Sequence, residues 1–188
     1  MWLYGCTIFL SAFLLFQIQP MVAKWMLPYF GGSAAVWTTC MLFFQSLLLL
    51  GCFYSDRLIR RLNPKAQAGV HFILLATSAI VLGMRPQTAA SFFGDRHPVL
   101  GILALLAASV GAPYFVLSTT TPLIQAWYAR GNKAALPYRL FALSKLSSIL
   151  ELLGYPVPVE PFLSLRHQFQ AWAAAYALFV ALLPASWI

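Results

Sequence analysis

The apolar residues of this chain come in long blocks, and several blocks approach the ~20 residues needed to cross about 30 Å of hydrocarbon. Hydrophobic residues make up 61% of the chain and charged residues only 9%. A soluble domain needs about a quarter charged residues to cover its surface. A soluble fold would leave whole blocks with nowhere to be buried, so the sequence predicts an integral membrane protein.

The boundaries of the blocks predict an all-α bundle of six transmembrane helices. Prolines, glycines and short polar segments separate the blocks, and no long polar linker divides the chain, so we expect one domain over residues 1–188. The helices are expected at about residues 3–26, 34–54, 68–84, 99–121, 138–159 and 168–188.

The basic residues between the blocks predict the orientation of the helices. With six crossings, the loops on one side hold the larger basic group, which comprises Arg57, Arg60, Arg61, Lys65, Arg130, Lys133 and Arg139. The opposite side holds Lys24, Arg85, Arg96 and Arg166. The richer side should be cytoplasmic, which places both termini in the cytoplasm. These basic residues set topology and meet anionic lipid, so the net charge of +8 does not indicate nucleic-acid binding.

Two short segments suggest an internal repeat. "PMVAKW" at Pro20–Trp25 and "PLIQAW" at Pro122–Trp127 share a proline, two apolar residues and a tryptophan at equal spacing. A repeat of three helices reverses its direction in the membrane, and inverted repeats with proline-interrupted helices are typical of secondary transporters. Chance is the alternative, because proline and tryptophan are common near membrane interfaces. If the repeat is real, the first and fourth helices should bend near Pro20 and near Pro113 or Pro122.

Several polar residues lie inside the apolar blocks, where they must face the bundle, water or another chain. They are Gln17, Gln19, Lys24, Gln45, Lys145 and Glu151. Glu151 lies near the middle of the fifth block, and a charge there is costly. It is interpreted either as a proton or cation site or as an acid bonded to a neighbouring helix. Lys24 is interpreted either as part of a substrate path or as a side chain that extends to the outer interface.

The sequence contains no recognisable catalytic or metal-binding pattern. It has no glycine-rich nucleotide motif after a strand and no C-x-x-C pair. The cysteines lie inside apolar blocks, as small core residues do. His71, His97 and His167 fall near predicted helix ends, which favours interface histidines over metal or haem ligands. We therefore expect no enzyme activity, no cofactor and no bound metal.

The end of the second block, "GCFYSDRLIRR" at Gly51–Arg61, resembles the G-x-x-x-D-R-x-G-R-R loop motif of the major facilitator superfamily. Here the spacing from glycine to aspartate is one residue longer, and Ile59 replaces the second glycine. In that superfamily the acid and the arginines hold helix ends together on the cytoplasmic side. The resemblance implies this role for Gly51, Asp56, Arg57, Arg60 and Arg61.

Three longer stretches, Phe9–Gln45, Leu105–Arg130 and Pro137–Pro161, resemble the amino-terminal membrane region of bacterial fused major-facilitator and spermidine synthase-like proteins. The family has a Rossmann-like aminopropyltransferase domain after its helices, and residues 1–188 hold none. Where the family has Ser-Asn-x-Gly-Ser, this chain has Ser-Lys-Leu-Ser-Ser from Ser144. Where the family has an alanine, this chain has Glu151.

The resemblance implies a bundle like one half of a major facilitator, with a 3+3 inverted repeat, in the bacterial inner membrane. Two functions are compatible with it. The chain is either a non-catalytic accessory or structural subunit of a larger membrane complex, or a half-transporter that dimerises to move a small solute, cations included. Its expected partners are the lipid bilayer and other membrane chains or a second copy.

Overall fold

The computed structural model describes residues 2–83, 98–131 and 138–185, and over these residues the chain is helical, without strands. Two short π-helical segments, labelled η1 and η2, each continue the α-helix that precedes them. The elements in chain order are α1 (Trp2–Phe30), α2 (Ala34–Arg61), α3 (Pro64–Gly83), α5 (Pro98–Leu106), η1 (Ala107–Gly111), α6 (Ala112–Gly131), α7 (Tyr138–Gly154), η2 (Tyr155–Val159) and α8 (Leu165–Ala185).

Local chemistry explains where the first helices end and begin. Gly31 has a φ of +73°, a left-handed conformation that favours glycine and terminates α1. The hydroxyl of Ser33 then accepts a hydrogen bond from the Val36 N–H and caps α2. Pro64 occupies the first position of α3, where its missing N–H costs nothing, and the Asn63 side chain accepts from the Ala66 N–H at 2.8 Å.

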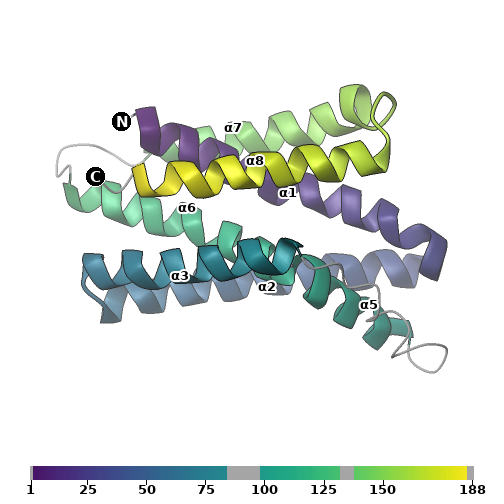
Figure 1. Ribbon diagram of the computed structural model, residues 1–188, viewed down its shortest axis with the longest axis horizontal. Helices are drawn as coiled ribbons and strands as arrows, with labels where there is room; N and C mark the ends of the chain where they lie inside the picture. Colours follow the sequence, from purple (N-terminus) through teal and green to yellow (C-terminus); the bar gives the residue numbers. More distant parts are fainter. Residues whose placement is uncertain (1, 84–97, 132–137, 186–188) are drawn as a thin grey trace.

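Four helical spans in the described residues are long and apolar enough to cross a bilayer: Leu3–Phe30, Ala34–Arg61, Val99–Arg130 and Tyr138–Val159. Such helices are consistent with a membrane protein. The helices lie side by side along the long axis, and both ends of the chain lie at the left in Figure 1. In the same view the α2–α3 connection is at the left and the α7–α8 connection is at the right.

Several predicted helix boundaries are wrong, because the helices continue past the ends of the apolar blocks. The second helix was expected to stop at about residue 54, yet α2 continues to Arg61. An ion pair of 2.8 Å between Asp56 and Arg60, one turn apart, supports this extension. The fourth was expected to stop at about residue 121, yet α6 continues to Gly131 through Pro122. The predicted loop with Arg85 and Arg96, and Lys133, lie outside the described residues.

In the fourth helix a bend was predicted near Pro113 or Pro122. The π-helical segment η1 lies beside the first of these and ends two residues before Pro113. Proline donates no hydrogen bond to the preceding turn and crowds it, so a wider π turn accommodates the ring. Pro20 and Pro122, in contrast, lie inside α-helical segments. The second π segment, η2, was not predicted, and it includes Pro158.

Two central helices, α1 and α6, organise the packing. Helix α1 packs against α7, α6 and α8, and α6 packs against α2, α1 and α3. Helices α3 and α8 also touch. The indole of Trp172 in α8 is buried and donates to the Leu14 carbonyl at 2.9 Å. Gly51 lets α2 approach α6 closely, since a Cβ there would lie 2.9 Å from the Ser118 Cβ.

Candidate functional site

Glu151 lies inside the bundle, which is one of the surroundings expected for the polar residues of the apolar blocks. The residue is only 4% exposed, on the face of α7 that carries Ser147 and that continues to Tyr155 at the start of η2. Oε1 of its carboxyl has no hydrogen-bond partner among the described residues. Ser147 donates to the Phe9 carbonyl at 2.7 Å and Ser148 to the Ser144 carbonyl at 2.9 Å. The two serines therefore do not donate to Glu151.

Lys145, unlike Glu151, lies on an exposed face of α7. Its side chain is exposed, and the ammonium lies 5.4 Å from the centre of the Phe141 ring, one turn earlier. The two unusual charges of α7 thus lie in different surroundings. Lys145 is available to lipid headgroups or another chain, whereas Glu151 is not.

The three intramembrane glutamines have three different environments. Gln19 donates to the Tyr114 hydroxyl at 3.0 Å and thereby links α1 to α6. Gln17 is half-buried in α1, and no hydrogen bond joins its amide to the described part of the chain. Gln45 is exposed near the middle of α2, next to the exposed Ser46, and its amide also has no partner among the described residues. Only Gln19 acts as a link between helices here.

At one end of the bundle, the buried Gln67 organises a group of polar contacts that we call the α3 cap cluster. Its Nε2 donates to the Leu62 carbonyl at 2.7 Å, and its Oε1 accepts from Trp127 Nε1 at 2.9 Å. Arg130 donates to the same Oε1 at 3.2 Å and to the Ile59 carbonyl at 3.1 Å. The cluster holds the end of α6 against the α2–α3 connection. Its members are Ile59, Leu62, Gln67, Trp127 and Arg130.

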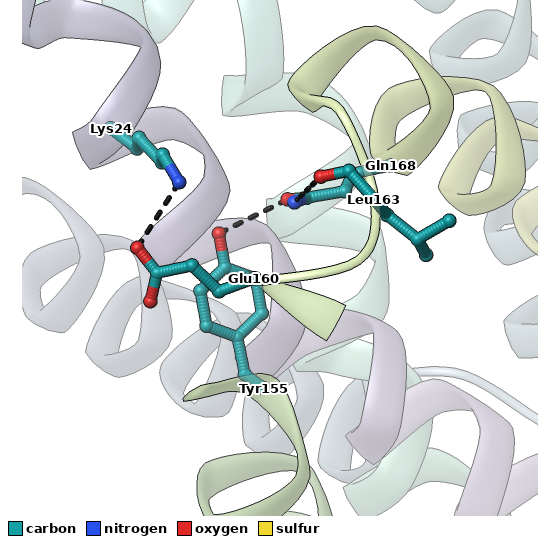
Figure 2. Close-up of polar contacts among 5 residues, drawn as sticks. All are labelled: Lys24, Tyr155, Glu160, Leu163 and Gln168. Atoms are coloured by element: carbon teal, nitrogen blue, oxygen red, sulfur yellow. Dashed lines mark hydrogen bonds and ion pairs between the residues drawn. The ribbon is translucent and has the colours of Figure 1, made fainter. Parts of the chain in front are cut away.

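The α8 cap cluster, at the other end, is drawn in Figure 2. Gln168 Nε2 donates to the Leu163 carbonyl at 2.8 Å, and its Oε1 accepts from the Tyr155 hydroxyl at 3.1 Å. Beside them, Lys24 Nζ lies 3.1 Å from a carboxylate oxygen of Glu160. This ion pair holds α1 against the α7–α8 connection. The sequence suggested that Lys24 is part of a substrate path or extends to the outer interface. Its ion pair with Glu160 was not predicted.

The two clusters are built alike. Leu163 and Gln168 follow Leu62 and Gln67 at one constant offset, and both glutamines donate to a carbonyl five residues earlier. Helices α3 and α8 each also contact a tryptophan of the PLIQAW or PMVAKW segment, respectively. Trp127 bonds to Gln67, and the Trp25 ring packs edge-on at 6.5 Å against Phe169.

Gln67, Gln168 and Glu160 were not singled out from the sequence. The constant offset between the two Leu-x4-Gln segments was the signal that could have revealed the glutamines. Their bonding partners could not be read in this way, because Trp127 lies 60 residues from Gln67 along the chain.

The residues of the supposed loop motif lie in α2 and not in a loop. Gly51 packs against Ser118, as described above. Asp56 pairs within its own helix, and the Arg57 guanidinium lies 4.6 Å from the centre of the Phe53 ring. Arg60 and Arg61 are exposed in the last turn, where cations offset the helix dipole. Among the described residues, Arg130 of α6 makes the contact between helix ends that the resemblance implied for these residues.

One histidine prediction is wrong. His71 is fully buried in α3 and lies 3.1 Å from the Thr120 hydroxyl, because α3 begins at Pro64 and so His71 lies in its second turn. His167 is exposed in the first turn of α8 and pairs with the Ser164 hydroxyl at 2.8 Å. His97 lies outside the described residues.

Gln67→Leu is expected to destabilise the fold far more than Lys24→Met. The first change leaves the Trp127 N–H and the Arg130 guanidinium without their shared acceptor, which costs about 2–4 kcal/mol. The second removes half of an ion pair whose side chains are 40% and 45% exposed. Such pairs contribute less than about 1 kcal/mol. Thermal unfolding of the detergent-solubilised variants checks this, and equal losses would contradict it.

Within the described residues, no group of three or more histidine, cysteine, aspartate or glutamate side chains could hold a metal ion. Comparison of the chain with protein-family models, curated proteins and solved structures found no match. The arrangement of the described polar groups joins helices at both ends of the bundle. Among the described residues, Oε1 of Glu151, the Tyr54 hydroxyl and Nδ1 of His71 are buried without a partner, and the amides of Gln17 and Gln45 also have none.

Proposed function

We propose that this chain is a non-catalytic, multi-pass membrane protein that acts as a structural or accessory subunit of a larger membrane complex. The observation that carries the proposal is the exposed pair Gln45 and Ser46, near the middle of a helix whose other exposed residues are largely apolar, among them Met41, Leu42 and Leu49. The bundle is proposed to lie in the bacterial inner membrane.

An amide without a hydrogen-bond partner is unfavourable in hydrocarbon. Moving an amide from water to an alkane costs roughly 4–8 kcal/mol when nothing there can bond to it. Polar residues of membrane helices therefore face a bundle, a cavity or another chain. Gln45 does not face its own bundle, so a second protein surface or a water-filled boundary between two chains would satisfy it. Lys145, exposed on α7, adds a second polar contact.

A half-transporter that dimerises is the second candidate, and the packing pattern favours it. Exchanging α1, α2 and α3 with α5–α6, α7 and α8 leaves the set of principal helix contacts unchanged. The likeness of the α3 and α8 cap clusters adds to this pattern. Both features support a 3+3 inverted repeat like one half of a major facilitator. In this candidate a second copy supplies the other wall of the pathway, and Glu151 supplies a proton or cation site.

Reporter fusions test the proposed topology of six crossings with both termini cytoplasmic. The basic residues Arg57, Arg60, Arg61 and Arg130 lie at the end of the bundle that holds both termini, which supports this orientation. Reporters fused after residues 65, 133 and 188 should give cytoplasmic signals. Those after residues 96 and 166 should give external signals. An external signal after residue 65 or 188 would contradict the orientation.

Gentle purification tests the proposed function itself. We expect the chain, extracted directly into nanodiscs, to carry stoichiometric amounts of one other membrane protein, identified by mass spectrometry. A second copy in its place would favour the half-transporter. The purified chain should show no aminopropyltransferase activity. A particle containing a single chain and lipid alone would contradict both candidates.

A further inference from the structure

A groove between α1, α7 and α8 opens at the end of the bundle where both chain termini lie. Its volume is about 670 Å³, within the roughly 300–1,000 Å³ of typical small-molecule sites. Apolar side chains line it almost completely, and one charged residue joins them. Its lining includes Gly5, Cys6, Phe9, Arg139, Leu143 and Leu182.

We propose that this groove binds an anionic phospholipid, with an acyl chain along its apolar wall and the phosphate at Arg139. Helix α7 begins at Tyr138, so Arg139 stands in its first turn, at the level where a lipid headgroup meets a transmembrane helix. Its side chain is exposed, and no ion pair joins it to the described part of the chain. Arginine recognises phosphate through two parallel N–H···O bonds.

The orientation supports an anionic lipid over a zwitterionic one. The proposal rests on the membrane topology given above, in which this end faces the cytoplasm. Anionic lipids give the cytoplasmic leaflet its negative surface potential. Arg57 and Arg130 lie at the same end of the bundle, and they add to the positive field that attracts such lipids. Gly5 lets α1 approach α7 closely at the wall of the groove, because a Cβ there would lie 3.2 Å from the Leu143 side chain.

Native mass spectrometry tests the proposal on the full chain. The chain is reconstituted in nanodiscs of equal parts phosphatidylglycerol and phosphatidylcholine, and the lipids that remain bound to one chain are counted. We expect wild type to retain one phosphatidylglycerol in preference to phosphatidylcholine. Arg139→Gln should lower that preference about fivefold. Arg57→Gln is the matched control, since Arg57 adds to the positive field at the same end but does not line the groove, and it should lower the preference far less than Arg139→Gln does.

Cys6→Phe separates the groove from the surface charge. Cys6 is exposed and lines the groove, so a phenyl ring would occupy the space of the acyl chain without disturbing buried packing. We expect this variant to retain neither lipid, although Arg139 is present. Equal retention of both lipids by wild type, or equal loss in the Arg139 and Arg57 variants, would overturn the proposal. Lipid is counted on single chains, so failure here is distinguishable from failure to find a partner protein.

Discussion

Gly51→Leu is expected to abolish the close packing of α2 against α6 and to leave little folded protein in detergent. A Cβ at this position would already lie 2.9 Å from the Ser118 Cβ, and a hydrogen bond from Ser55 to the Thr119 carbonyl fixes the two helices beside it. The helices must separate to admit a larger side chain. Overpacking of this kind costs about 3 kcal/mol or more.

Gly69→Leu is the matched control for that change. Gly69 lies in α3, is exposed, and would place a Cβ with nothing within 4 Å. The same substitution there should leave stability unchanged or slightly raised, because leucine favours a helix more than glycine does. Size-exclusion profiles and thermal unfolding measure both variants. A Gly51→Leu protein as stable as Gly69→Leu would show that α2 and α6 do not meet as described.

Glu151→Met is expected to stabilise the protein by about 1–3 kcal/mol, because an apolar side chain of similar length replaces a buried carboxyl with an unpaired oxygen. Glu151→Gln keeps the polarity and should change stability little. Both variants should assemble like wild type, since Glu151 is buried in its own bundle and does not reach a partner. Thermal unfolding in one detergent ranks the three proteins.

A marked loss of stability in Glu151→Met would contradict this expectation and would mean that the carboxyl holds a bonding partner. A Glu151→Met protein that is more stable but has lost its function would indicate that Glu151 is kept for its chemistry and not for stability. In the half-transporter candidate, Glu151→Gln abolishes proton-coupled uptake and leaves assembly intact. Wild-type uptake by this variant would exclude a coupling role for Glu151.

The all-helical character of the chain followed from its apolar blocks, and the ends of the helices did not. Apolar blocks of about 20 residues predict crossings because the bilayer sets that length. The charge of Arg57 and Arg61 predicts a loop, yet both residues continue α2, because a helix can extend beyond the hydrocarbon with its polar residues. The interior position of Glu151 was among the predictions, since a carboxyl cannot face lipid unaided.

Tertiary partners were the part that the sequence did not reveal. Lys24 pairs with Glu160, a residue 136 positions away, and nothing in either local pattern points to the other. Gln67 and Gln168 lie in the first turns of α3 and α8, where a polar residue resembles an ordinary helix start. Only the folded chain brings Trp127 and Tyr155 to their amide oxygens.

Photo-cross-linking from α2 in native membranes tests the central claim most directly, namely that another protein chain covers the surface around Gln45. In a background with Cys6 and Cys52 changed to serine, a thiol-linked benzophenone is attached to a Gln45→Cys variant. An Ile80→Cys variant is the control, since Ile80 is an exposed apolar residue of α3.

We predict that irradiation joins the Gln45→Cys variant to one discrete protein, while the Ile80→Cys variant yields lipid adducts only. An adduct of twice the mass of the chain would favour the dimeric half-transporter, and any other single mass would identify the host complex. Lipid adducts alone at both positions would contradict the claim.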